Sequence, residues 1–250
     1  MKICAAQTRP LKGDIAKNID AHNKLIKLAV DSGASLICFP ELSLTGYEPT
    51  LAKELAIRSE DPRLDEFQIL SDLNNLSIAL GAPVETRRGI ALGMIIFVPG
   101  QKRQVYSKQY LHEDEYPFFV NGLHPLVLTL GSKKIAPAIC FEISVPQHAT
   151  YAHEAGADFY MASVAKSATG VEKALDQLSC IARDYSMQVL IANSTGPADD
   201  MICGGRTSAF RRDGSIAGQL DDQDEGILVM DTGTEEAFFK MVQAIWLKPI

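Results

Sequence analysis

The sequence predicts an α/β protein, a four-layer α-β-β-α sandwich made of two similar halves. Residues 2–8, 14–31 and 35–39 indicate a strand, an amphipathic helix and an apolar strand, which is the order of a βαβ unit with parallel pairing. A second series of elements in the same order begins at residue 133. Because buried parallel strands need cover on both faces, two such sheets can pack against each other with their helices outside.

The remaining elements of the first half follow from hydrophobic periodicity and turn residues. Pro99-Gly100 separates two of the predicted strands and indicates a hairpin. Residues 109–122 are irregular and rich in acidic and aromatic groups, which is typical of a surface loop near a functional site. The expected elements are a helix over 64–74 and strands over 77–82, 90–98 and 101–108.

The second half repeats this plan and ends in short strands. No Pro-rich, Ser-rich or low-complexity linker interrupts the sequence, so we expect residues 1–250 to form a single domain. Strands are expected over 133–140, 158–164 and 188–193, and helices over 146–155 and 172–186. Short strands are expected near 206–211, 214–220 and 225–231, followed by a last helix over 234–241.

Composition excludes several classes of function. The net charge of −7, without clusters of Lys and Arg, argues against nucleic-acid binding. The apolar runs are too short to span a bilayer and the first residues lack a signal peptide, so we expect a cytoplasmic protein without a membrane partner. The five cysteines are odd in number and widely spaced, which argues against a disulfide framework. No Cys/His cluster suggests a metal, and we expect no cofactor.

Three chemically active side chains lie at predicted strand ends. Cys140 follows the apolar run 135–139, Glu41 follows Phe39-Pro40, and Lys108 ends the segment that begins at Gln101. If the three ends converge, they place a thiol, a general base and a cation in one pocket. This set is sufficient for acyl transfer through a thioester.

Each assignment competes with a plainer interpretation. Most cysteines in apolar runs are small core residues, and we assign Cys4, Cys38, Cys180 and Cys203 to that class. Cys140 differs because it lies on a strand-to-helix turn, where the Phe141 N–H can stabilise an oxyanion. A Cys–His pair is the alternative, but no histidine lies at a strand end, and a helical histidine is expected to face solvent. The candidates are His22, His112, His124, His148 and His153.

These segments resemble the nitrilase, or carbon–nitrogen hydrolase, superfamily. The family's Glu, Lys and Cys correspond to Glu41, Lys108 and Cys140, in the same order and at similar spacing. The matching stretches are Phe39-Pro40-Glu41-Leu42-Ser43-Leu44-Thr45-Gly46-Tyr47, Tyr106-Ser107-Lys108, Ile139-Cys140-Phe141-Glu142, Gly205-Arg206-Thr207-Ser208 and Asp213-Gly214.

The resemblance implies a sandwich fold and hydrolysis of a nonpeptide carbon–nitrogen bond through a covalent cysteine intermediate, without metal or cofactor. It also implies a homodimer or a larger homo-oligomer. A second glutamate after the lysine corresponds to Glu115, with Glu113 as the alternative, and would orient Lys108 and the substrate. The substrate-binding residues that the resemblance implies are Tyr47, Phe141 and Glu142, together with Ser163, Val164 and Ala165, where the backbone after the strand 158–164 resembles the segment that lines the family's pocket.

The substrate stays open at this point. Family members often have a histidine soon after the lysine and an arginine after the cysteine, whereas this chain has Gln109-Tyr110-Leu111 and Ile143-Ser144. The leading hypothesis is an amidase that releases ammonia. Lys166 could bind the acidic tail of an ω-amide substrate, and a solvated lysine is the equal alternative. The alternatives are an N-carbamoyl amide hydrolase, a nitrilase, a catalytically silent binding module and a redox-sensing thiol at Cys140.

Overall fold

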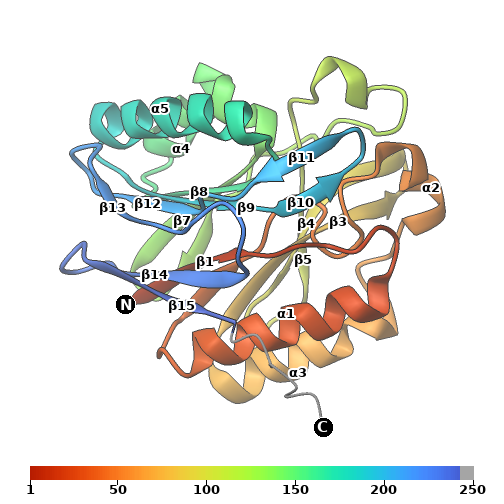
Figure 1. The fold of residues 1–250 in the computed structure, drawn as a ribbon, viewed down its shortest axis with the longest axis horizontal. Coiled ribbons are helices and arrows are strands. Elements are labelled where there is room, and N and C mark those ends of the chain that lie inside the picture. The colour runs from red at the N-terminus through yellow and green to blue at the C-terminus, as the bar shows by residue number, and fades with distance from the viewer. Residues whose placement is uncertain (243–250) are drawn as a thin grey trace, which may run out of the picture.

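The computed structural model describes residues 1–242 and has the four layers expected from the sequence. Two β-sheets face each other in the middle of the molecule (Figure 1). Helices α1 and α3 cover the outer face of one sheet, and α4 and α5 cover the outer face of the other. The α-β-β-α architecture is therefore confirmed.

The first sheet has seven strands in the order β15-β14-β1-β2-β3-β4-β5. Strands β1, β2 and β3 are parallel, as a βαβ unit requires, and the other neighbours are antiparallel. The bounds are β1 Lys2–Gln7, β2 Leu36–Cys38, β3 Ser77–Thr86, β4 Gly89–Phe97, β5 Gln104–Ser107, β14 Gly226–Asp231 and β15 Ala237–Met241.

The second sheet has six strands in the order β13-β12-β9-β8-β7-β6. Its parallel core of β7, β8 and β9 repeats the β1-β2-β3 arrangement of the first sheet, which gives the two similar halves. The bounds are β6 Leu128–Leu130, β7 Lys133–Ile139, β8 Phe159–Val164, β9 Gln188–Asn193, β12 Ser208–Phe210 and β13 Ile216–Gln219, with β10 Thr195–Ala198 and β11 Met201–Gly204 forming a separate hairpin.

The two longest helices, α1 and α5, begin at residues whose side chains cap them. Asp14 accepts a hydrogen bond from the Lys17 N–H at the start of α1, and Ser167 accepts one from the Gly170 N–H at the start of α5. No helix within residues 1–242 is long and apolar enough to cross a membrane. The bounds are α1 Ile15–Val30, α2 Ala52–Leu55, α3 Asp65–Asn74, α4 Pro146–Glu154 and α5 Ala168–Tyr185, with 3₁₀ turns at Pro49–Leu51, Pro62–Leu64, Glu113–Glu115 and Cys140–Ser144.

The apolar core forms three layers that match this architecture. The layer between the sheets holds residues from both halves, so the two halves share one core. The outer layers lie under α1 and α3 on one side and under α4 and α5 on the other. Large members of the central layer are Leu36, Met94, Tyr106, Ile135, Phe159 and Leu190.

The end of the described chain departs from the prediction. The helix expected over 234–241 is wrong, because residues 237–241 form strand β15. A turn in which the Asp231 carboxylate accepts the Gly233 N–H reverses the chain, and β15 then pairs along the free edge of β14. Strand β14 pairs with β1, so the C-terminal segment completes the sheet of the first half. Tertiary pairing has overridden local helix preference here.

Candidate functional site

Glu41 follows β2 on a tight turn that packs against β3. The Phe39 N–H bonds the Ala79 carbonyl, and the Leu44 N–H bonds the Gly81 carbonyl. A side chain at Gly81 would place its Cβ 2.3 Å from the Leu42 nitrogen, so only glycine permits this approach. The turn directs Glu41 inward, where its side chain is fully buried.

Lys108 follows β5 and is fully buried. Its N–H bonds the Leu92 carbonyl, and its own carbonyl accepts the Gly122 N–H of the returning loop. A Cβ at Gly122 would lie 2.0 Å from the Ser107 carbonyl oxygen, so glycine is required where the loop closes on the strand end. Lys108 is thereby fixed from both sides.

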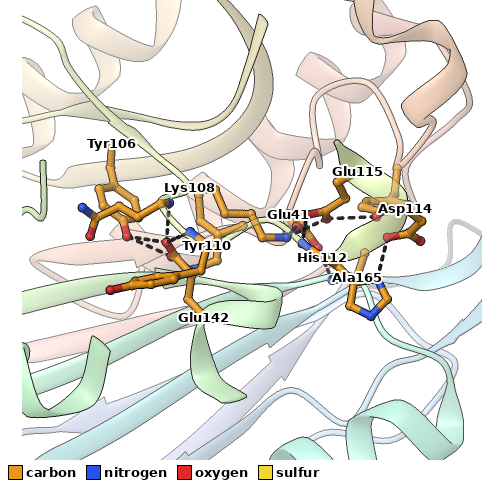
Figure 2. A network of polar contacts seen from close by, with 12 residues as sticks. Glu41, Tyr106, Lys108, Tyr110, His112, Asp114, Glu115, Glu142 and Ala165 are labelled. Carbon is orange, nitrogen blue, oxygen red and sulfur yellow. Dashed lines mark hydrogen bonds and ion pairs between the residues drawn. The ribbon is translucent and has the colours of Figure 1, made fainter. Parts of the chain in front are cut away.

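The Lys108 ammonium lies between two buried carboxylates. Its Nζ is 3.0 Å from Glu41 Oε1 and 2.6 Å from Glu115 Oε1 (Figure 2). Glu41 Oε2 accepts the Ala165 N–H at 3.2 Å, so the site also includes the end of β8. The remaining Glu115 oxygen accepts the His112 N–H at 2.8 Å, and the Tyr47 hydroxyl donates to Oε1. These contacts satisfy charges that burial would otherwise make costly.

Cys140 lies on the turn after β7 and lines the same pocket. Its φ of +45° is in the left-handed region, which a non-glycine residue adopts at a cost of roughly 1–2 kcal/mol. Such strain persists where neighbouring contacts determine the backbone. The pocket has a volume of about 240 Å³, and its lining includes Tyr47, Lys108, Glu115, Cys140, Phe141, Ala165 and Lys166.

Burial and charge set the ionisation of these groups. Burial raises the pKa of Glu41 above its ordinary value, although Lys108 opposes the change. Burial alone would lower the pKa of Lys108, but the negative charges around it, with Glu41 foremost, raise that pKa and keep the amine protonated. Burial raises the pKa of Cys140 to about 11, with Glu41 adding to the rise and Lys166 and Lys108 opposing it. A protonated thiol therefore lies beside a carboxylate that can accept its proton.

Other predicted site residues have different surroundings. Glu142 is fully buried and its carboxylate bonds Tyr106 and backbone N–H groups, so it does not line the pocket. Ser163 donates to the Phe39 carbonyl at 2.8 Å, and Val164 packs under α5. Successive side chains on a strand point to opposite faces, and at the end of β8 both Ser163 and Val164 pack against other parts of the protein. Ala165, which follows the strand, lines the pocket.

The structure distinguishes Glu115 from Glu113, the alternative for the second glutamate, by their positions relative to Lys108. Glu115 bonds Lys108, whereas Glu113, on the same 3₁₀ turn, is exposed. His22 and His148, expected to face solvent, are instead buried and outside the pocket, while His112 lines it and packs edge-on against Phe141.

The sequence interpretation missed one wall of the pocket. Asp199, Asp200 and Met201 line it from the turn of the β10–β11 hairpin, which was not predicted. Gly196-Pro197 followed by two aspartates is a turn signal that could have located this hairpin. Asp114 is a further acidic residue at the pocket. Within residues 1–242, no group of three or more His, Cys, Asp or Glu side chains is arranged to hold a metal ion.

Comparison with known sequences gives a consistent assignment. The carbon–nitrogen hydrolase family profile matches residues 2–236. The chain is 25% identical over 246 residues to a glutamine-dependent NAD(+) synthetase of Thermotoga maritima, which covers 94% of this chain and 42% of that protein. It is 24% identical over 248 residues to a probable nitrilase of Schizosaccharomyces pombe, covering 94% of this chain and 89% of that protein. The chain thus spans less than half the length of the synthetase.

The fold also has solved counterparts. The NitN amidase from Nesterenkonia sp. AN1 superposes with a TM-score of 0.83 at 22% identity, covering 92% of each chain. That likeness establishes the shared fold. The family profile, which spans nearly the whole sequence, establishes the relationship: the chain belongs to the carbon–nitrogen hydrolase family.

Proposed function

We propose that this enzyme hydrolyses a small amide to a carboxylic acid and ammonia through a thioester on Cys140. The observation that carries the proposal is the Lys108 ammonium bonded to Glu41 and Glu115 in the pocket that Cys140 lines. A nucleophile, a base and a fixed cation beside one small cavity are the parts that acyl transfer needs.

The first step forms the thioester. Glu41 takes the proton from the Cys140 thiol while the sulfur attacks the amide carbon. Lys108 and the Phe141 N–H stabilise the negative charge that develops on the carbonyl oxygen. When the tetrahedral intermediate collapses, the C–N bond breaks and Glu41 returns its proton to the leaving nitrogen, which departs as ammonia.

The second step releases the acid. Water enters the position that ammonia left, and Glu41 accepts one of its protons as its oxygen attacks the thioester carbon. The C–S bond then breaks and the sulfur recovers a proton from Glu41. Glu115 holds Lys108 through both steps, since its Oε1 lies 2.6 Å from Nζ. We infer that Tyr47, which donates to Glu115, and Ala165, which donates to Glu41, hold the two carboxylates in place and border the substrate.

The charges around the pocket favour a second, narrower candidate. Lys166 lines the pocket near Cys140, whose pKa it lowers, and Asp114, Asp199 and Asp200 also line it. An amide with both a carboxylate and an ammonium group complements this pattern better than a singly anionic ω-amide does. The NAD(+) synthetases similar to this chain are named as glutamine-dependent, so glutamine is the specific candidate of this kind.

An ammonia-release assay tests the proposal. The panel holds neutral aliphatic amides, glutamine, succinamate, N-carbamoyl compounds and nitriles. We expect turnover of one amide class, and a loss of at least about 10³-fold in Cys140→Ala. Cys180→Ala is the matched control, because Cys180 is exposed and away from the pocket. Turnover of carbamoyl compounds or nitriles alone would favour those hydrolases. No turnover and no adduct on the thiol would favour a binding module.

Three further expectations accompany this function. We propose that residues 1–250 form one hydrolase domain, that it assembles into a homodimer or larger homo-oligomer, and that it works in the cytoplasm. All five cysteines are free thiols, which suits a reducing compartment. Light scattering of the purified protein tests the assembly, and a single unfolding transition tests the single domain.

A further inference from the structure

Glu142 is a buried carboxylate that faces away from the substrate pocket. It is fully buried, two residues after the nucleophile, and no lysine or arginine pairs with it among the described residues. A carboxylate in this setting needs hydrogen-bond donors in place of water. Its donors come from two different segments of the chain, and this is the feature that gives it a function.

The two oxygens of Glu142 bind the two catalytic turns. Oε1 accepts the Gln109 N–H at 2.6 Å, directly after Lys108. Oε2 accepts the Ile139 N–H at 2.7 Å, directly before Cys140. The Tyr106 hydroxyl donates between them, at 2.8 Å and 2.9 Å (Figure 2). One carboxylate thus joins the residue after the catalytic cation to the residue before the nucleophile.

The hydrogen bonds around Glu142 are arranged so that both of its oxygens accept. His148 Nε2 lies 2.9 Å from the Tyr106 oxygen, and its Nδ1 lies 2.8 Å from the Tyr160 hydroxyl. If Tyr160 donates to Nδ1 and Nε2–H donates to Tyr106, then Tyr106 is left to donate to Glu142. Burial lowers the pKa of His148 to about 4, which agrees with the neutral imidazole that this chain of hydrogen bonds requires.

We propose that Glu142 is a positioning residue that clamps the turn carrying Lys108 to the turn carrying Cys140. We name Glu142 with the Gln109 and Ile139 N–H groups and the Tyr106 hydroxyl the carboxylate clamp. It fixes the separation of cation and sulfur from the side opposite the pocket. It also holds the residue before the strained Cys140 backbone, whose φ is +45°. The proposal rests on the catalytic roles given above to Lys108 and Cys140.

The decisive variant is Glu142→Gln. Every neighbour of the two oxygens is a donor, so an NH2 group in place of either oxygen must face an N–H or displace Tyr106, and one turn loses its anchor. We expect kcat to fall at least about 10-fold with little change in KM, because a misplacement near 1 Å costs up to about 10²-fold. Glu142→Asp keeps the carboxylate but is one methylene shorter, so its kcat is expected to lie between those of the wild type and Glu142→Gln.

A second readout follows the Lys108–Cys140 separation without any substrate. The rate at which iodoacetamide alkylates Cys140 is measured against pH, with Cys140→Ala as the blank. Lys108 lowers the pKa of Cys140, so loosening the clamp moves the alkylation midpoint to higher pH. This readout tests the clamp even if the wild type hydrolyses no amide in the panel, so failure of the proposed function is distinguished from failure of the clamp.

Controls separate positioning from stability. Leu178→Ala thins the packing of α5 and removes no hydrogen bond of either turn, so it is expected to lower Tm and leave the alkylation midpoint unchanged. If Glu142→Gln does not fold, Tyr106→Phe removes one donor only and should raise the midpoint in the same direction by less. An unchanged midpoint in Glu142→Gln and Tyr106→Phe, or changes no larger than in Leu178→Ala, would overturn the proposal.

Discussion

The turn after β2 and the turn after β7 lie at equivalent places in the two halves and share a plan. Each holds a non-glycine residue with positive φ, Leu42 at 49° and Cys140 at 45°. Each buries a glutamate, Glu41 in the first half and Glu142 in the second. The shared plan shows that a strained turn with an inward carboxylate is a feature of both halves.

Each turn is also supported by a buried histidine from a helix. His22 of α1 lies 2.9 Å from the Ser43 hydroxyl, next to the Glu41 turn. His148 of α4 contacts Tyr106, which bonds Glu142. Burial lowers the pKa of both imidazoles to about 4, so both are neutral supports near pH 7.

The two glutamates differ in their partners. Glu41 bonds a cation and one N–H at the pocket, whereas Glu142 bonds three N–H groups and a hydroxyl away from it. Burial raises the pKa of Glu142 to about 7, and also raises that of Glu41. Burial and a perturbed pKa therefore do not separate a proposed base from a positioning residue, but the identity and position of the donors do.

The substitution Glu41→Gln is expected to have the largest effect, and it tests whether Glu41 and Glu142 have different roles. Losing the base should lower kcat by about 10²–10⁴-fold, more than Glu142→Gln does. Glu41 also raises the pKa of Cys140, so its loss should move the iodoacetamide midpoint to lower pH, opposite to the direction expected for Glu142→Gln. Matching shifts in the two variants would show that the glutamates do not have separate roles.

Glu41→Gln also tests the pH dependence of kcat/KM. Glu41 acts as a base only when ionised, and its pKa is raised by burial. The loss of kcat/KM toward acid should therefore begin above the ordinary carboxyl value of about 4.3. That acid limb should be absent from the residual activity of Glu41→Gln, as measured from pH 4 to 9.

Replacing Lys108 tests the contribution of the cation that pairs with Glu41 and Glu115. Lys108→Met leaves two buried carboxylates without their cation, and should lower the free energy of unfolding by about 3–5 kcal/mol. It should also lower kcat/KM by about 10²–10³-fold. Urea unfolding measures the first effect and ammonia release the second. Lys133→Met is the control: its partly exposed pair with Asp158 contributes about 1 kcal/mol or less, so an equal loss there would contradict the assignment.

The two glutamates of the 3₁₀ turn at 113–115 provide a further contrast, with a smaller expected effect on kcat. Glu115→Gln replaces the carboxylate bonded to Lys108 and should lower kcat by about 10–10²-fold through misplacement of the amine. Glu113→Gln alters an exposed residue of the same 3₁₀ turn and should leave kcat within about 2-fold. Equal effects of the two changes would remove Glu115 from the site.

A last prediction concerns the dependence of the free energy of unfolding on pH. The pKa of His22 is about 4 in the folded protein and about 6.5 in an unfolded chain, so the unfolded chain binds more protons between these values. His22 should therefore lower the free energy of unfolding of the wild type by about 3 kcal/mol as pH falls from about 6.5 to about 4, and should not lower it above pH 6.5.

Urea unfolding of the wild type and His22→Asn at pH 7 and pH 4.5 isolates this effect. The raised pKa of Glu142 gives the opposite trend, because its contribution is lost as pH rises toward about 7, but it acts in both proteins. The difference in free energy of unfolding between the wild type and His22→Asn should therefore be smaller at pH 4.5 than at pH 7. A difference that is constant with pH would contradict a neutral buried His22.

The sequence allowed prediction of the parts of the site that strand ends determine. Glu41 and Cys140 follow β2 and β7, which belong to the parallel cores of the two sheets. Lys108 follows β5, which runs in the same direction as β3 because both pair antiparallel with β4. The direction of a side chain within a turn was not predictable. Glu142, two residues after Cys140 on a 3₁₀ turn, was expected at the substrate but points to the clamp.

Two other misses have a tertiary cause. The β10–β11 hairpin has short strands with little apolar alternation, so its Asp199 and Asp200 were not placed at the pocket. Segment 237–241 is a strand only because β14 offers it a free edge. Neither contact is encoded in local periodicity.

The central claim is that the Cys140 sulfur carries the acyl group during turnover. Rapid acid quench of the wild type during hydrolysis of its best amide, followed by peptide mass spectrometry, tests it most directly. The account predicts an added mass equal to the substrate acyl group on the peptide containing Cys140, and none in Cys140→Ala. Steady release of ammonia by Cys140→Ala at the wild-type rate, with no acyl group on the wild-type thiol, would contradict it.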